Sequence, residues 1–258
     1  MPVILRQALV IVAILAMIAI NGLANALPIN GQQTGAVADR FDVLFVPAGY
    51  VFSIWGLIYL ALLTYAGYQA LPRSREDERV RSIDGLVIAS CVANGSWIFA
   101  WHYELFGLSL VLMLGLLASL IGVYVRLDIG LTKPETRQRL CVDLPFSIYL
   151  GWITVATIAN ASTVLVDLGW GGWGLSDFTW LVVMLVAALG IASVMTWSRG
   201  DVAYLAVLIW AFVGIAVKHA ATQPIAVVAG GSAAVVVGLV VLALVRNRGL
   251  RPARAALA

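Results

Sequence analysis

The chain has 258 residues, of which 62% are hydrophobic and only 11% are charged, whereas about 25% of the residues of an ordinary soluble domain are charged. This composition excludes a soluble globular enzyme, and the net charge of +3 does not indicate a nucleic-acid partner. It predicts an all-α, polytopic membrane protein. Stretches of about 20 apolar residues, long enough to cross a hydrocarbon core of about 30 Å, recur along the whole sequence.

Eight such segments are predicted to be transmembrane helices. They cover roughly residues 4–27, 46–70, 83–102, 106–126, 142–166, 178–198, 202–218 and 223–245. The first run follows Arg6 and ends in small residues, as a signal peptide would. Because its apolar run of about 20 residues exceeds the usual 7 to 15 of a signal peptide, we expect it to be retained as a helix.

The basic residues test this count, because cytoplasmic loops collect Lys and Arg. With the N-terminus inside, fourteen of the 16 basic residues fall on the inner side, and only Arg40 and Lys218 fall outside. The inner ones are Arg6, Arg73, Arg75, Arg79, Arg81, Arg126, Lys133, Arg137, Arg139, Arg199, Arg246, Arg248, Arg251 and Arg254. We therefore expect both termini to be cytoplasmic, in a bacterial cytoplasmic membrane.

Three of the segments carry aromatic and amide residues at helical spacing, which gathers them onto one stripe of each helix. The stripes are Phe52, Trp55 and Tyr59; Asn94, Trp97 and Trp101; and Tyr149, Trp152, Ala156 and Asn160. They are predicted to line a pocket for a flat, mostly apolar molecule. The helix directions place Trp55 and Trp97 in the outer half of the membrane and Trp152 in the inner half, so the pocket is expected to run vertically.

Two alternatives stay open for these residues. Asn94 and Asn160 lie at membrane depth, where an unpaired amide is costly, so they either hydrogen-bond between helices or contact a ligand. Tryptophans at helix ends usually form an interfacial belt. Five of the nine fit that interpretation by position, namely Trp101, Trp170, Trp173, Trp180 and Trp197.

Catalytic and metal-binding residues are not predicted. Cys91 and Cys141 have neither CxxC spacing nor a His neighbour, so they are expected to be small packed residues. Asp84 and Asp143 near inner helix ends, and His102 and Glu104 near an outer turn, are expected to be interfacial.

The three stripes resemble motifs of the tryptophan-rich sensory protein and translocator protein family (TspO/MBR). The second-helix motif is matched by Pro47, Tyr50, Val51, Phe52, Ile54, Trp55, Ile58 and Tyr59, with Tyr50 replacing a Trp. The third-helix motif is matched by Asn94, Trp97, Phe99 and Trp101, and the fifth by Tyr149, Trp152, Ala156, Thr157 and Asn160. The resemblance covers about residues 1–166.

The resemblance implies a pocket beneath the first outer loop that binds porphyrins such as protoporphyrin IX or haem, and in some members sterols. The first loop here has no tryptophan, Ile148 stands in place of a Pro, and the Tyr and Arg of the sterol motif are missing after Asn160. The expectation is therefore a receptor or binding protein with a sensory or trafficking role, not an enzyme, with no obligatory cofactor. A permease for a lipophilic molecule and a structural subunit of a larger pigment complex are the alternatives.

The chain is thus expected to divide into four parts. Residues 1–166 form a TspO-like ligand-binding bundle, 167–177 an outer loop, 178–246 three additional helices and 247–258 a basic cytoplasmic tail. The outer loop at residues 27–46 is either a lid or a plain connection. Gly230, Ala234 and Gly238 form a small-residue face that serves packing within the chain or a homodimer.

Overall fold

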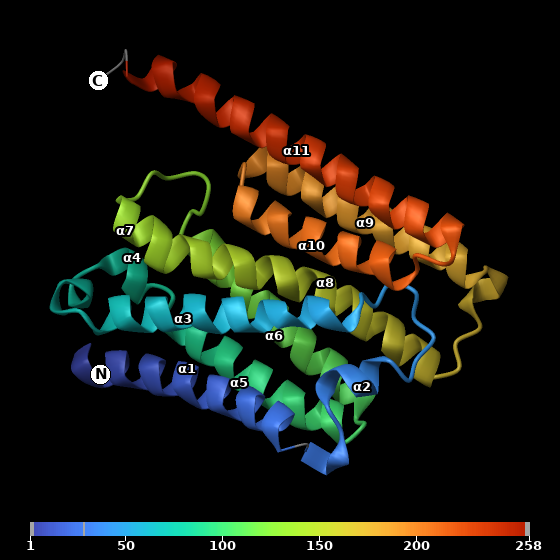
Figure 1. Cartoon of the computed structure of the whole chain (residues 1–258). Coiled ribbons are helices and arrows are strands. Elements are labelled where there is room, and N and C mark those ends of the chain that lie inside the picture. Colours follow the sequence, from blue (N-terminus) through green and yellow to red (C-terminus); the bar gives the residue numbers. More distant parts are fainter. Residues whose placement is uncertain (1–2, 28, 256–258) are drawn as a thin grey trace.

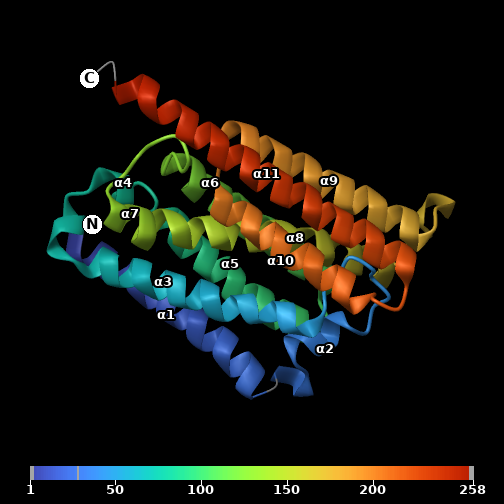
Figure 2. The same ribbon diagram turned by 45° about the horizontal axis from the view of Figure 1, so that its top comes forward.

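The computed structural model describes residues 3–27 and 29–255, with side chains up to Asn247, and this part of the chain contains helices and no strands. Eight long helices lie side by side (Figures 1 and 2). They are α1 (Val3–Ala26), α3 (Ile54–Ala70), α5 (Asp84–His102), α6 (Phe106–Arg126), α8 (Leu144–Asp167), α9 (Asp177–Ser198), α10 (Val202–Lys218) and α11 (Gln223–Ala255). Seven of these segments are long and apolar enough to cross a membrane, and α10, with 17 residues, is shorter.

The positions of the eight helices match the predicted segments, but three boundaries differ. The second segment was predicted to begin at residue 46, whereas a 3-10 turn covers Gly49–Ser53 and α3 begins only at Ile54. Pro47 favours an extended residue before it, and the backbone that follows is bound to α10, where Ala48 donates to the Gly214 carbonyl oxygen and Val51 accepts from the Trp210 indole.

The fifth segment was predicted to begin at residue 142, but helical structure starts earlier. It runs through α7 (Thr136–Gln138) and a π-helical turn (Arg139–Asp143) into α8. Pro145 lies in the first turn of α8. A proline inside a helix cannot donate its backbone bond and conflicts with the carbonyl four residues earlier, and a wider turn just before it relieves that conflict.

At the C-terminus, most of the predicted basic tail continues α11 as far as Ala255. Residues 256–258 of that tail lie outside the described part of the chain.

Helix α8 lies at the centre of the molecule. It packs against α3, α6 and α10, while α1 covers α3 and α5, and α9 and α11 cover α10. Its most apolar window is 72% buried, the largest share of any of the candidate spans. Gly151 allows α10 to approach closely, since a Cβ there would come within 3.1 Å of the Tyr204 carbonyl oxygen. The C-terminal helices therefore share one hydrophobic core with the first five.

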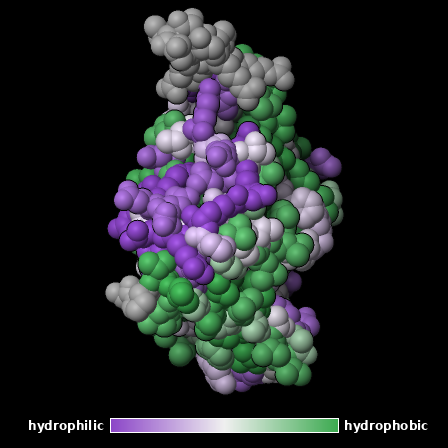
Figure 3. Space-filling model, turned by 90° about the vertical axis from the view of Figure 1, so that its left-hand side faces the viewer, coloured by the Kyte–Doolittle hydropathy of each residue, from purple (hydrophilic) through white to green (hydrophobic). Residues whose placement is uncertain are grey.

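Two buried ion pairs hold the end of the molecule where the N-terminus and α4 (Glu78–Arg81) lie. Arg6 lies 2.7 Å from Asp84, and Arg79 lies 2.6 Å from Asp143. Figure 3 shows hydrophilic residues gathered over this end. The prediction that both aspartates are interfacial did not include these pairs: the two residues are 3% and 7% exposed, and each is paired with an arginine from another segment.

The small-residue face of α11 is only partly used within the chain. Gly230 lies against Ala216 of α10, with 4.0 Å between the Ala216 methyl carbon and the position of a Cβ. Ala234 and Gly238 are exposed. A homodimer through this face stays a prediction.

Candidate functional site

The three aromatic stripes meet at a cavity between α3, α5 and α8. Its volume is about 50 Å³. Seven of its lining residues belong to the predicted stripes, namely Phe52, Trp55, Trp97, Trp101, Trp152, Ala156 and Asn160. Three helices that are far apart in the sequence thus present their aromatic faces to one space.

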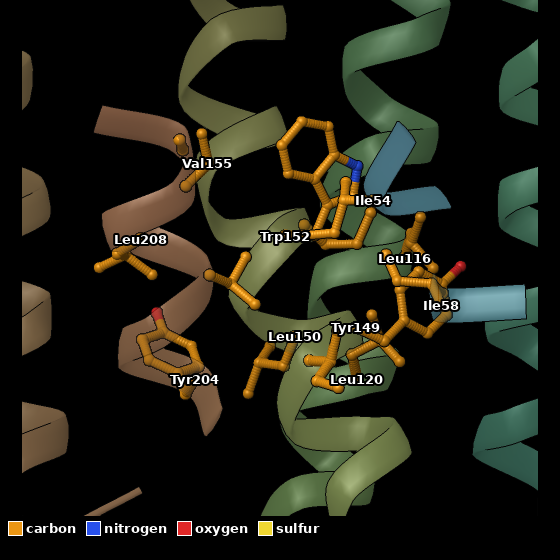
Figure 4. Packing of buried hydrophobic residues seen from close by; sticks show 14 of the residues in the cluster. Ile54, Ile58, Leu116, Leu120, Tyr149, Leu150, Trp152, Val155, Tyr204 and Leu208 are labelled. Atoms are coloured by element: carbon orange, nitrogen blue, oxygen red, sulfur yellow. The ribbon is translucent and has the colours of Figure 1, made fainter. Parts of the chain in front are cut away.

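The aromatic rings of the lining contact one another mostly edge to face. The ring of Trp152 lies 5.8 Å from that of Phe52 and 6.3 Å from that of Trp55, each at 85°, a geometry that aromatic pairs prefer. Trp97 and Trp101 stack at 5.4 Å. In Figure 4, Trp152 and Tyr149 extend from α8 toward Ile54 and Ile58 of α3, whereas Val155 faces Leu208 of α10.

The vertical course of the pocket stays a prediction. The rings of Trp55 and Trp152 lie 6.3 Å apart, although the two residues were predicted to lie in opposite halves of the membrane. Two features of the helices account for this contact. The helical segment around Trp152 spans 32 residues from Thr136 to Asp167, so Trp152 is near its middle instead of its inner half. In addition, α3 begins only after the turn at Gly49–Ser53, with Trp55 at its second residue.

The two asparagines of the stripes both hydrogen-bond between helices. The Asn94 carbonyl oxygen accepts from Asn21 of α1 at 2.7 Å, and its amide donates to the Tyr149 hydroxyl at 3.0 Å. Asn160 accepts from the Trp97 indole at 3.1 Å and donates to the Ser109 hydroxyl at 3.0 Å. Asn94 and Tyr149 are therefore structural supports behind the cavity, whereas Asn160 also lines it.

One polar group of the cavity wall has no partner. Trp152 is 2% exposed, and its indole nitrogen makes no hydrogen bond to any described residue. A buried N–H without a partner costs about 1–3 kcal/mol, so a bound molecule with an acceptor would relieve this cost.

Three residues differ from their predicted position: two do not line the cavity, and one is too buried for an interfacial belt. Tyr50 is 46% exposed and packs edge to face on Trp210 of α10, 5.4 Å away, so it stands apart from the cavity. Tyr59 stacks on Trp55 at 5.6 Å without lining the cavity. Trp101 is only 4% exposed, which makes the belt interpretation wrong for it.

The loop between α1 and α3 covers one end of the cavity, and its helix α2 (Thr34–Ala38) is docked on the end of α5. The Trp101 indole donates to the Thr34 carbonyl oxygen at 3.1 Å, and the Thr34 hydroxyl lies 2.9 Å from His102 Nε2. The other ring nitrogen of His102 lies 3.1 Å from the Ile29 carbonyl oxygen. Thr34, Ala38, Val46 and Pro47 contribute to the lining, so the loop has the position of a lid.

A comparison with protein-family models matches residues 7–242 to the family of TSPO-like proteins. The chain belongs to that family. The match continues through α9, α10 and most of α11, beyond the five helices that carry the sequence motifs. No curated protein and no solved structure shows a significant match.

Several lining residues of this TSPO-like protein could not be found from the three stripes. They are Thr34, Ala38, Val46, Pro47, Met113, Val155, Ala159 and Thr163. Ala159 and Thr163 continue the stripe of α8 at helical spacing, so a longer stripe would have found them. The loop residues and Met113 carry no periodic signal, because their positions depend on how the loop and α6 pack.

The lining of the TSPO-like cavity is chemically uniform. Every described residue that lines it is apolar or a neutral threonine, tryptophan or asparagine. The described residues also contain no group of three His, Cys, Asp or Glu that could hold a metal. The lining therefore presents ring faces and a few neutral hydrogen-bonding groups to the cavity.

The lid is fastened to the turn after α5 by Glu104. Its carboxylate accepts from Gln32 at 2.8 Å and from Arg40 at 3.0 Å. These two hydrogen bonds and the positive charge of Arg40 lower the pKa of Glu104. A carboxyl group with a lowered pKa in the folded protein stabilises it above the usual pKa of about 4.3, and this contribution is lost as the pH falls through the lowered value.

We therefore expect Glu104→Gln to lower the thermal unfolding midpoint in detergent at neutral pH, and the difference from the wild type to vanish in acid. Asp42→Asn is the matched control, because Asp42 lies in the same loop and makes no ion pair with a described residue. Its difference from the wild type should be small and should not follow the same curve. A Glu104→Gln difference that persists unchanged below the pKa would contradict this role of the carboxylate.

Proposed function

We propose that this TSPO-like protein is a membrane receptor or binding protein for a flat lipophilic ligand of the porphyrin class. The observation that carries the proposal is the unpartnered indole N–H of Trp152 in a cavity lined by four tryptophans. Ring faces suit a planar macrocycle, and the indole suits a carbonyl or carboxylate acceptor on it. The absence of ionisable side chains from the described lining supports binding in preference to catalysis.

Binding of a molecule this large requires the site to open. A cavity of about 50 Å³ is far smaller than the roughly 300–1,000 Å³ of pockets for drug-sized ligands. The lid is the element that would have to move. Hydrogen bonds and an exposed ion pair to residues such as His102 and Glu104 fasten it, and its own residues Val37 and Phe45 are fully buried, so the ligand has to replace these apolar contacts when the lid opens. We propose that displacement of residues 29–47 enlarges the cavity and admits the ligand.

Trp152→Phe tests this site, because it removes the N–H and keeps an aromatic ring. We expect it to weaken binding of protoporphyrin IX by about tenfold, as loss of a hydrogen bond of about 1.5 kcal/mol would. The measurement is a titration of purified protein followed by quenching of tryptophan fluorescence and by porphyrin absorbance. Asn160→Ala should also weaken binding.

Trp173→Phe is the control for the loss of one fluorophore, since Trp173 is 80% exposed in the outer loop. It should leave the affinity unchanged. Wild-type affinity in both Trp152→Phe and Asn160→Ala would exclude this cavity as the porphyrin site. A labelled porphyrin that crosses proteoliposomes containing the wild type would instead indicate a permease.

We further propose eight membrane crossings with both termini in the cytoplasm of a bacterial cell. The apolar α10 connects α9 to α11 and packs against both, which supports counting it as a crossing despite its length. The Arg-rich segments, including the loop at 73–81 and the segment at 126–139, lie together at the end shown in Figure 3. That distribution supports the cytoplasmic assignment of this end.

A further inference from the structure

A second, larger hollow lies at the opposite end of the molecule from the lid. It has about 740 Å³ of space and opens between three segments. These are the α6–α8 connection (residues 129–139), the α9–α10 turn (198–203) and the final described turns of α11 up to Asn247. Figure 1 places all three at the end that carries α7 and the N-terminus. We call this hollow the inner cleft.

The inner cleft has an excess of positive charge. Four cationic side chains line it, Lys133, Arg139, Arg199 and Arg246, against two carboxylates. Both carboxylates already have hydrogen-bonding partners within the protein. Asp143 is paired with Arg79 at 2.6 Å, and Asp201 accepts from the Tyr124 hydroxyl at 2.9 Å and from two backbone N–H groups of α10.

The two arginines that form the sides of the cleft are held in place without a carboxylate partner among the residues up to Asn247. The guanidinium of Arg199 lies 5.6 Å from the centre of the Tyr124 ring and donates to the Ile129 carbonyl oxygen. That of Arg246 lies 4.7 Å from the Trp197 ring and donates to the carbonyl oxygens of Thr196 and Trp197. A guanidinium has five N–H donors, so each keeps several for an anion.

Close backbone contacts fix the geometry of the walls. Gly130 has φ +82°, and a Cβ there would overlap the Arg199 carbonyl oxygen. Gly200 has φ +61° and lies against the side chain of Asn247, whose amide donates to the Gly200 carbonyl oxygen at 3.2 Å. The three segments are therefore locked to one another, and the cations are presented at a defined spacing.

Two exposed apolar side chains mark the mouth of the inner cleft. Trp197, which is 59% exposed, and Leu244, which is 44% exposed, lie on its rim. An exposed indole at a helix end is typical of the headgroup region, and the apolar rim would accept the beginning of an acyl chain. Basic residues near the bilayer surface attract anionic lipid.

We propose that the inner cleft binds the phosphate headgroup of an anionic phospholipid from the inner leaflet. The phosphate would lie between Arg199 and Arg246, with Lys133 and Arg139 on the solvent side. Arginine suits this role because its planar fork binds phosphate oxygens in pairs. The site is separate from the aromatic cavity and does not depend on the function proposed for it.

The test measures binding of phosphatidylglycerol to the full-length protein in neutral detergent, by native mass spectrometry and by the thermal unfolding midpoint. We expect saturable binding of phosphatidylglycerol and not of phosphatidylcholine. Arg199→Gln/Arg246→Gln should weaken it by about tenfold to thirtyfold. Lys133→Gln/Arg139→Gln should also weaken it, and because these exposed side chains make no hydrogen bond or ion pair with a described residue, that variant should fold normally.

The matched control is Arg73→Gln/Arg126→Gln, which removes two cations from the same end outside the cleft. Arg73 lies over the Tyr68 ring and Arg126 donates to the Ser82 carbonyl oxygen. An equal loss of lipid binding in this control would overturn the proposal in favour of diffuse surface attraction. Displacement of the lipid by equimolar inorganic phosphate would overturn the assignment to a lipid and indicate a site for free phosphate.

Discussion

Arg6→Met is expected to destabilise the protein by about 3–5 kcal/mol, because it leaves the charge of Asp84 buried without its partner. Arg6 Nε lies 2.7 Å from Asp84, and the two side chains are 16% and 4% exposed. The remaining support of the carboxylate is a hydrogen bond from Gln69 at 2.8 Å. The loss should appear as a lower unfolding midpoint in detergent, by heat or by titration with sodium dodecyl sulfate.

Two further variants separate this effect from a general loss of packing. Arg6→Met/Asp84→Asn should recover most of the stability, because the amide is neutral and still accepts from Gln69. Arg40→Met breaks the pair with Glu104, in which both side chains are more than 40% exposed, and should cost at most about 1 kcal/mol. Equal losses in Arg6→Met and Arg40→Met, or no recovery in the double variant, would contradict the argument.

The helices could be predicted from the sequence because the bilayer sets both their length and their apolar character. The errors occurred where local backbone chemistry modified that rule. A 3-10 turn separates Pro47 from the start of α3, and a π-helical turn precedes Pro145. A count of apolar residues cannot predict either turn. The ion pairs of Asp84 and Asp143 were missed because their partners come from segments far away in the chain.

The candidate site was predictable to the extent that it repeats along helices. The residues Phe52, Trp55, Trp97, Trp152 and Asn160 share a cavity, as helical spacing within each stripe predicted. Their relative depth was not predictable, since it depends on tilt and on where each helix begins. The inner cleft has no periodic signal at all, because three separate loops and helix ends supply its residues.

Gly214→Ala is expected to destabilise the protein and to weaken ligand binding at the aromatic cavity, although Gly214 does not line it. A Cβ at this position in α10 would overlap Cγ2 of Val51 and come within 3.1 Å of Pro47. Pro47 and Phe52, on either side of Val51, line the cavity. Overpacking of this kind costs about 1–3 kcal/mol, and the loop would have to shift toward the cavity or away from α10.

The contact at Gly214 is also the way in which the C-terminal helices reach the site. The Ala48 backbone donates to the Gly214 carbonyl oxygen at 3.2 Å, and the Trp210 indole donates to the Val51 carbonyl oxygen at 3.0 Å. Helix α10 therefore holds the turn before α3 by two hydrogen bonds and one close approach. This arrangement gives α10 a direct part in shaping the cavity wall.

Val51→Ala should suppress the effect of Gly214→Ala, because it removes the Cγ2 atom with which the new methyl group collides. Gly190→Ala in α9 is the control, since a Cβ there meets nothing within 4 Å and replacement of a helical glycine by alanine is neutral or stabilising by up to about 1 kcal/mol. Both effects are measured by unfolding midpoints and by protoporphyrin IX titrations of the wild type, Gly214→Ala, Gly214→Ala/Val51→Ala and Gly190→Ala. If Gly214→Ala bound the porphyrin as the wild type does, α10 would support the fold without shaping the site, and the role of the C-terminal helices would have to be sought at the inner cleft.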